Sequence, residues 1–140
     1  MPYCKLYYHL VWSTRARQPI LTAPIEHMVY DLISSKAQNL GAHIHAIGGI
    51  EDHVHTVVEI PPKIAVATFV GQVKAVAATK FNKGRHSVGS LYWQKEYAAF
   101  SIDEKRLPNY IRYVERQKEH HAADNLIPIL ERTDTQGGGY

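Results

Sequence analysis

Hydrophobic and polar residues alternate along this chain in blocks whose periods predict strands and helices in turn. Residues 5–14 are rich in aromatic and β-branched side chains, which favours a strand, and a basic loop follows at 15–19. After Thr22 the apolar residues recur at helical spacing, with Thr22 as the N-cap, Pro24 in the first turn and Gly41 beyond the end. The chain therefore begins with a strand and an amphipathic helix.

The middle of the chain predicts a hairpin and a second helix. Residues 43–49 and 53–60 have the composition of strands, and the glycine-containing segment 48–52 separates them. Residues 63–81 return to helical spacing and present an apolar stripe along one face. The polar segment 82–87 then predicts a loop.

The last third of the chain predicts one more strand and one more helix. Residues 91–102 contain four aromatic side chains and favour a strand, although the interior of this segment is polar. Pro108 suits the first turn of a helix that runs to about His121. Residues 133–140 include three consecutive glycines and predict a flexible tail.

This order of elements predicts the fold class. Strand, helix, strand, strand, helix, strand and helix correspond to an α+β protein, specifically a ferredoxin-like βαββαβ sandwich with an additional C-terminal helix. A chain of 140 residues has the length of one domain. We therefore expect a single domain over residues 1–132, followed by the tail.

Composition narrows the possible functions. No apolar stretch approaches the roughly 18 residues of a membrane span, and the first residues lack the pattern of a signal peptide, so we expect a cytoplasmic protein without a membrane partner. Cys4 is the single cysteine, which excludes an intrachain disulfide and a cysteine-based zinc site. A net charge of +3 permits a phosphate-bearing partner but does not require one.

His53 and His55 are the first candidates for chemistry. Side chains on a strand alternate between its two faces, so these two imidazoles point the same way. Together they could bind a divalent metal ion. Their spacing alone does not distinguish a metal site from a pair of surface histidines, because His43 and His45 share it and we assign those two no metal role.

Tyr113 and Gln117 form a second candidate pair. Four residues separate them on the last predicted helix, so a phenol and an amide share one face there. Tyrosine has a pKa of about 10 and needs a metal or a base to act as a nucleophile. A metal bound to a phosphodiester oxygen would supply that help by offsetting charge in the transition state. Taken alone, the pair is better explained as an ordinary surface contact.

Three blocks of the sequence carry a family resemblance. They are YHLVWST at 8–14, DHVH at 52–55 and YVERQKEHH at 113–121. In this order and spacing they resemble the HUH-class single-tyrosine transposases of small prokaryotic insertion sequences, the insertion-sequence two-hundred group. The resemblance covers about residues 5–121, and it is the combination of the three blocks that is specific.

The resemblance implies a reaction, a metal site and partners. His53, His55 and Gln117 would bind Mg²⁺ or Mn²⁺, and Tyr113 would attack DNA to leave a 5′-phosphotyrosine bond and a free 3′-hydroxyl. The enzyme would be a transposase that cleaves and rejoins single-stranded DNA with hairpin ends, acting as a homodimer. Tyr110 lies three residues before Tyr113, but Tyr113 is the one with glutamine at the matching offset, so we choose it as the nucleophile.

Six basic residues are candidates for contacts with the DNA backbone, and Trp93 could stack on a base. For each cation the alternative is an ordinary solvated charge. The six are Arg15, Arg17, Lys74, Lys80, Lys83 and Arg85.

Two other functions compete with a transposase. A non-catalytic nucleic-acid-binding module could have the same βαββαβ order, but the Gly-Phe/Tyr-rich motif of RNA-recognition domains is absent from this sequence. A phosphodiesterase built on two His-x-Thr motifs would need a second copy of the chemistry of the segment HVHT at 53–56. The chain has one histidine followed by threonine in this way, His55.

Overall fold

A computed structural model of the chain describes residues 3–84, 89–123, 127–131 and 133. Its four strands form one antiparallel sheet in the order β2-β3-β1-β4. They are β1 (Tyr7–Ser13), β2 (His43–Ile50), β3 (His53–Glu59) and β4 (Ala98–Ile102). This strand order confirms the predicted ferredoxin-like arrangement.

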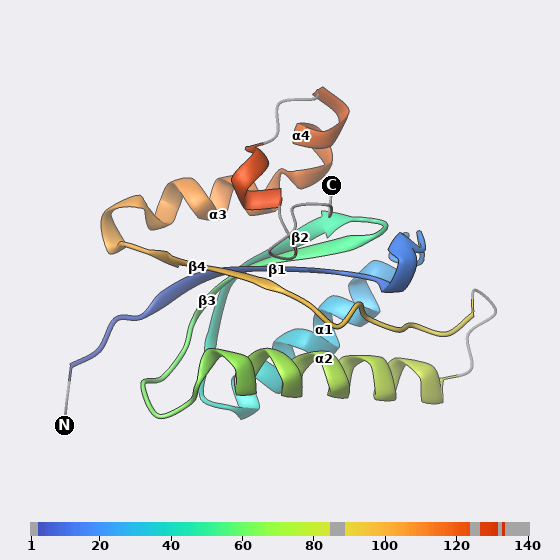
Figure 1. Ribbon diagram of the computed structural model, residues 1–140, viewed down its shortest axis with the longest axis horizontal. Coiled ribbons are helices and arrows are strands. Elements are labelled where there is room, and N and C mark those ends of the chain that lie inside the picture. The colour runs from blue at the N-terminus through green and yellow to red at the C-terminus, as the bar shows by residue number, and fades with distance from the viewer. Residues whose placement is uncertain (1–2, 85–88, 124–126, 132, 134–140) are drawn as a thin grey trace.

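Helices cover both faces of the sheet, as Figure 1 shows. One face is covered by α1 (Ile25–Asn39) and α2 (Val66–Lys83), and the other by α3 (Leu107–Glu115) and α4 (Gln117–Ala123). Three short 3-10 helices complete the described structure: η1 (Arg15–Arg17), η2 (Glu104–Arg106) and η3 (Pro128–Glu131). None of the described helices combines the length and apolarity that crossing a membrane would require.

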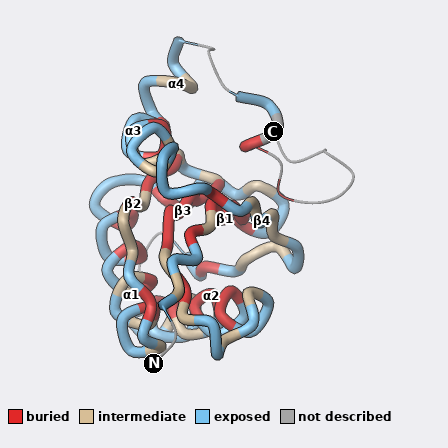
Figure 2. Tube along the Cα trace, turned by 90° about the vertical axis from the view of Figure 1, so that its left-hand side faces the viewer, coloured by how far each residue is buried: buried red, intermediate tan, exposed pale blue. Residues whose placement is uncertain are grey.

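Alternation along the central strands produces two separate cores. Leu10 and Trp12 of β1 and Val54 of β3 point toward α1 and α2, where they join the larger apolar cluster. The alternate residues of these strands point toward α3. Among them, Val57 of β3 packs with Val114 in a smaller cluster. In Figure 2 the trace is accordingly coloured as buried along parts of the strands and of the helices. Each fully buried large apolar side chain contributes about 1.5–3 kcal/mol.

Gly48 and Gly49 lie inside β2 and not in the turn that the sequence predicted. Gly48 pairs with His55 in the strand register. A Cβ at Gly48 would lie 2.1 Å from the carbonyl oxygen of Val114, which is too close for any side chain. Glycine at this position therefore allows α3 to approach β2 directly beside His55.

The strand predicted over residues 91–102 is shorter in the structure. Only its last part, β4, pairs with β1, and Trp93 forms an isolated bridge to the residue after β1. The carbonyls of residues 94–96 instead accept hydrogen bonds from Lys74 Nζ. These side-chain contacts, together with a backbone hydrogen bond from Gln94 N–H to the carbonyl of Ser13, hold the polar part of this segment.

The predicted helix from Pro108 to His121 is broken into α3 and α4 at Arg116, whose φ of −106° and ψ of 25° are not helical. Lys118 of α4 donates a hydrogen bond to Gly49 O at 3.1 Å and pairs with Glu26 of α1. These contacts fix the new direction of α4 after the break.

Two other predictions differ from the structure or fall outside it. The first helix begins at Ile25 with Pro24 in the N-cap position, so the prediction of Thr22 as N-cap is wrong. A residue that precedes proline is disfavoured in the helical conformation, which delays the start. The predicted tail at 133–140 lies outside the described residues except for Thr133, which is buried.

Candidate functional site

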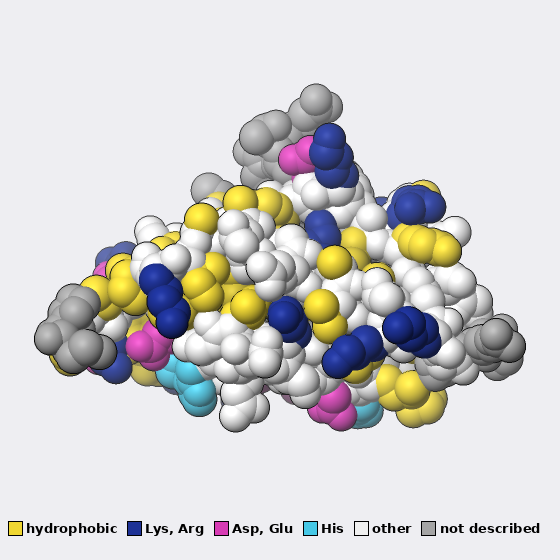
Figure 3. Space-filling view, turned by 90° about the horizontal axis from the view of Figure 1, so that it is seen from below, with side chains coloured by type: hydrophobic (Ala, Val, Ile, Leu, Met, Phe, Trp, Pro, Cys, Tyr) yellow, Lys and Arg dark blue, Asp and Glu magenta, His cyan; other side chains and the backbone are white. Residues whose placement is uncertain are grey.

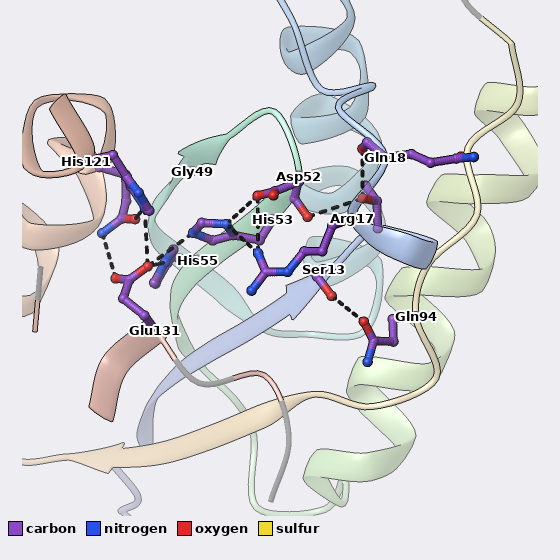
Figure 4. A network of polar contacts seen from close by, with 12 residues as sticks. Ser13, Arg17, Gln18, Gly49, Asp52, His53, His55, Gln94, His121 and Glu131 are labelled. Carbon is purple, nitrogen blue, oxygen red and sulfur yellow. Dashed lines mark hydrogen bonds and ion pairs between the residues drawn. The ribbon is translucent and has the colours of Figure 1, made fainter. Parts of the chain in front are cut away.

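His53 and His55 lie side by side on β3, on the face of the sheet that α3 and α4 cover. Both side chains are buried, and Val54 between them points into the other core. Their Nε2 atoms converge on Oε1 of Glu131 from η3, at 3.2 Å for His53 and 3.1 Å for His55 (Figure 4). The predicted orientation of the histidine pair is therefore present, and both rings face a carboxylate.

The other ring nitrogen of His53 is held by the hairpin turn. His53 Nδ1 lies 2.8 Å from Asp52 Oδ1, and Arg17 Nη1 lies 3.2 Å from the same oxygen. Burial alone would raise the pKa of Asp52, but hydrogen bonds from His53 and Arg17 hold it below its usual value. For His53 burial opposes the charged form, yet the contacts with Asp52 and Glu131 prevail and raise its pKa.

His55 is held on its far side by a third histidine. His9 on β1 places Nε2 at 2.9 Å from His55 Nδ1, with the two rings nearly parallel at 15°. Burial lowers the pKa of His55 to about 4 and that of His9 to about 3. Both imidazoles are therefore neutral at pH 7, the form that binds metals.

Glu131 joins the histidines to Tyr113 and Gln117. The Tyr113 hydroxyl donates to Oε2 of Glu131, and Gln117 Nε2 lies 3.3 Å from the same oxygen. His121 of α4 contacts the carboxylate from a third direction, with Nε2 at 3.3 Å from Oε1. Burial would raise the pKa of Glu131, but its contacts with His53 and His55 outweigh burial and keep the carboxyl ionised.

Tyr113 is held as a neutral phenol in this arrangement. The backbone N–H of Ile127 donates to its hydroxyl at 3.1 Å. Burial first, and then the hydrogen bond to Glu131, raise the pKa of Tyr113 above its usual value. Tyr110 packs with the smaller apolar cluster and lies beside His9, with ring centroids 6.0 Å apart. Of these two tyrosines, Tyr113 is the one whose hydroxyl bonds the carboxylate between the histidines.

The donor atoms in this cluster fit a divalent metal ion. One ligand atom from each of His53, His55 and Glu131 lies within 4.8 Å of the others, and all three residues are buried. Imidazole nitrogens and carboxylate oxygens are ligands for divalent first-row metals and, through oxygen, for Mg²⁺. The amide of Gln117 lies in the same cluster, where its Oε1 is 3.1 Å from His121 Nε2.

Glu131 is the residue of this cluster that sequence reasoning missed. It follows the last predicted helix by ten residues, in a segment without a periodic pattern or motif. No spacing relative to the histidines or to Tyr113 indicates that its side chain returns to them. Only the tertiary structure reveals that Glu131 lies beside the histidines and Tyr113.

The predicted DNA-contact residues are spread over the molecule. Arg15 is exposed and its guanidinium lies 4.4 Å from the centre of the Tyr92 ring, while Arg17 is tied to Asp52. Lys80 and Lys83 are exposed on α2, on the opposite side of the sheet from the histidines. Figure 3, which looks onto that side, shows Lys and Arg side chains at several places on this face. Arg85 lies outside the described residues.

Lys74 has a structural role in this fold. It is 9% exposed, and its Nζ donates to the carbonyls of Gln94 at 2.7 Å and of Lys95 and Glu96 at 3.3 Å. Burial lowers the pKa of Lys74 to about 8. An ammonium has three N–H donors, and three carbonyls occupy them here, so this arrangement does not support a contact with DNA. Trp93 is also engaged, because its Nε1 donates to the Lys74 carbonyl at 3.0 Å.

Comparison with known proteins gives one family and two similar folds. The family model for IS200-like transposases matches residues 2–117. A candidate transposase from Deinococcus radiodurans R1 has 23% identity and a TM-score of 0.66, covering 83% of this chain and 93% of that one. A REP-associated tyrosine transposase bound to a REP hairpin has 15% identity and a TM-score of 0.64, covering 86% and 72%. No curated protein matches the chain.

These matches agree with the resemblance found in the sequence. The family match includes the strands that carry the histidines and the helix that carries Tyr113, and it ends at Gln117. The two solved structures share the architecture of the sheet and its helices at low identity. The chain therefore belongs to the family of IS200-like transposases.

Proposed function

We propose that this protein is a metal-dependent transposase that cleaves and rejoins single-stranded DNA through Tyr113. One observation supports this proposal above the others: the Tyr113 hydroxyl and the Nε2 atoms of His53 and His55 meet at a single buried carboxylate, Glu131. The proposed nucleophile and the proposed metal ligands therefore contact one another in this chain. A nucleic-acid-binding module without catalysis would have no need for this convergence.

The metal ligands we propose are His53, His55 and Gln117, with the Glu131 carboxylate as an additional oxygen ligand, and the ion is Mg²⁺ or Mn²⁺. When bound, the ion polarises the scissile phosphodiester and offsets the negative charge that develops on its oxygens. Asp52 and His9 occupy the Nδ1 sides of the two imidazoles, so both Nε2 atoms remain directed at the site.

The chain itself supplies the nucleophile and its position. Tyr113 must lose its hydroxyl proton, for which Glu131 Oε2 is the hydrogen-bonded acceptor, before its oxygen can attack phosphorus. The bond from phosphorus to the 3′ oxygen then breaks, the 3′ oxygen takes up that proton and leaves as a free hydroxyl, and the 5′ phosphate stays on the tyrosine. Since one phosphodiester replaces another, a 3′-hydroxyl can later reverse the step and rejoin DNA without an external energy source.

The proposed substrate is single-stranded DNA that carries hairpin ends, and the proposed assembly is a homodimer. The REP hairpin bound by the structurally similar tyrosine transposase supports a folded DNA strand as the partner. Arg15, Arg17, Lys80, Lys83 and Arg85 remain proposed contacts with its phosphates.

The decisive experiment looks for a covalent protein–DNA adduct. Single-stranded oligonucleotides that cover both flanks of the gene are incubated with the protein and Mn²⁺, and denaturing gels detect the adduct. A 3′-end label should stay with the protein and a 5′-end label should leave, because the tyrosine keeps the 5′ phosphate. Tyr113→Phe should remove the adduct and keep DNA binding.

Tyr110→Phe is the matched control, since it removes a hydroxyl three residues away on the same helix, and it should form the adduct. An adduct in Tyr113→Phe that disappears in Tyr110→Phe would exclude Tyr113 as the nucleophile. If the wild-type protein binds the strands but forms no adduct with any of them, the non-catalytic binding module is the better description.

A further inference from the structure

His9 is a fully buried histidine to which the sequence reasoning assigns no role. It lies on β1, which pairs with β3 so that Val11 is opposite His55. His9 is two residues before Val11 on the same strand face, and its ring stacks on that of His55 with centroids 5.0 Å apart. Its Nε2 lies 2.9 Å from His55 Nδ1.

Metal binding by an imidazole constrains both of its nitrogens. The nitrogen that binds the metal contributes its lone pair, so in the neutral ring the proton must sit on the other nitrogen. That N–H needs an acceptor, which in metal sites fixes both the tautomer and the orientation of the ring. For His53 the acceptor is Asp52 Oδ1. For His55 the described group in the equivalent place is His9 Nε2.

We propose that His9 is a positioning residue for the metal site: with the ion bound, it accepts the Nδ1–H of His55 and so holds His55 in the tautomer that presents Nε2 to the ion. This inference depends on the proposed metal-dependent function. The two ligands are then oriented by different means, His53 by a carboxylate from its own hairpin and His55 by an imidazole from the neighbouring strand.

Packing alone does not explain a histidine at position 9. A phenylalanine ring would fill a similar space without the cost of burying polar atoms. Among the described residues, His9 Nδ1 has no hydrogen-bond partner, although it is buried. Leaving such an atom unsatisfied costs about 1–3 kcal/mol. The polar contact that the side chain does make is the one to His55, a proposed metal ligand.

Two substitutions of similar size separate the packing role of the His9 side chain from its role as a hydrogen-bond acceptor. His9→Phe keeps an aromatic ring against His55 but removes the acceptor, whereas His9→Gln places an amide oxygen near the position of Nε2. Mn²⁺ affinity is measured from the electron paramagnetic resonance signal of the free ion. His9→Phe should raise the dissociation constant about 10–100-fold. His9→Gln should recover most of that loss, and thermal unfolding should show that both variants are folded.

His45→Phe is the control, because it makes the same chemical change in the other His-x-His pair and should leave Mn²⁺ affinity unchanged. Nuclear magnetic resonance of ¹⁵N-labelled protein with Mg²⁺ adds a direct signature: His55 should carry its proton on Nδ1 in the wild type. A proton on Nε2 would overturn the proposal, as would equal Mn²⁺ affinities of the wild type and His9→Phe, or equal losses in His9→Phe and His9→Gln. A wild type that binds no Mn²⁺ would overturn the metal site as well.

Discussion

The two faces of the sheet bury very different kinds of residue. Between the sheet and α1 and α2, the core is formed by aliphatic and aromatic side chains. Between the sheet and α3, a small apolar cluster adjoins a set of buried histidines with one carboxylate. The same strand serves both faces, since Val54 points to one and its two histidine neighbours to the other. One face thus stabilises the fold while the other holds polar groups in fixed positions.

The comparison predicts that substitutions on the two faces have separable effects. A substitution on the polar face should remove metal binding or adduct formation and keep the fold. A change on the apolar face should weaken the fold and keep the metal affinity of the molecules that remain folded. Buried polar groups normally have partners, so a polar face of this kind is stable when its members satisfy one another.

The largest effect is expected for His55→Ala. It removes a ligand, so Mn²⁺ binding and DNA adduct formation should fall below detection. It also leaves Glu131 and His9 without one partner each, for which we expect a loss of about 1–3 kcal/mol in the free energy of unfolding. Mn²⁺ titration and urea unfolding measure the two quantities. His45→Ala should change neither, because His45 lies on the edge strand β2 and contacts Glu59 at 3.6 Å.

Phe69→Ala should have the next largest effect, which is a loss of stability. Phe69 of α2 is 1% exposed in the larger cluster. Replacing a buried phenylalanine with alanine typically costs about 3–5 kcal/mol, from lost transfer energy and the cavity left behind. Urea unfolding should show that loss, while the Mn²⁺ dissociation constant stays within about twofold at low urea. A large change in metal affinity would mean that the two faces are coupled.

A smaller effect, on the rate of adduct formation, is expected for Gly48→Ala. The added Cβ would meet the Val114 carbonyl and push α3, with Tyr113, away from the histidines. A displacement of about 1 Å can slow an enzyme about 100-fold, so adduct formation should slow by that order, with Mn²⁺ affinity less affected. Gly71→Ala is the matched control, since a Cβ at Gly71 meets nothing within 4 Å. It should stabilise α2 by up to about 1 kcal/mol and leave the rate unchanged.

Periodicity was sufficient to predict the layers of this fold but not every boundary. The patterns around β1 and β3 are strong because aromatic and β-branched side chains suit strands that are buried on both faces, and the pattern of α2 is strong because its apolar residues recur at helical period on one buried face. The pattern failed where long-range contacts decide the structure. Gly48 and Gly49 suggest a turn, yet they continue a strand in which the backbone of α3 packs against Gly48 and the backbone of β3 lies against Gly49.

The candidate site was predicted only in part, because some of its features depend on local pattern and others on long-range contacts. Strand alternation is local, so it correctly predicted that His53 and His55 share a face. Charge alone suggested Lys74 as a DNA contact, and the carbonyls of residues 94–96 that enclose its ammonium come from a distant segment. His9 stands in one of the recognised blocks, but its contact with His55 depends on strand register, which the sequence pattern did not specify.

Glu131 also shows what a family assignment leaves out. The family match ends at Gln117, so a related sequence could match over its whole length and still carry a different residue, or none, where this chain has its buried carboxylate. Relatives with the same histidines and tyrosine could then differ in how tightly they hold a metal ion. Distinguishing such relatives requires comparing the segment after Gln117, where the family match ends.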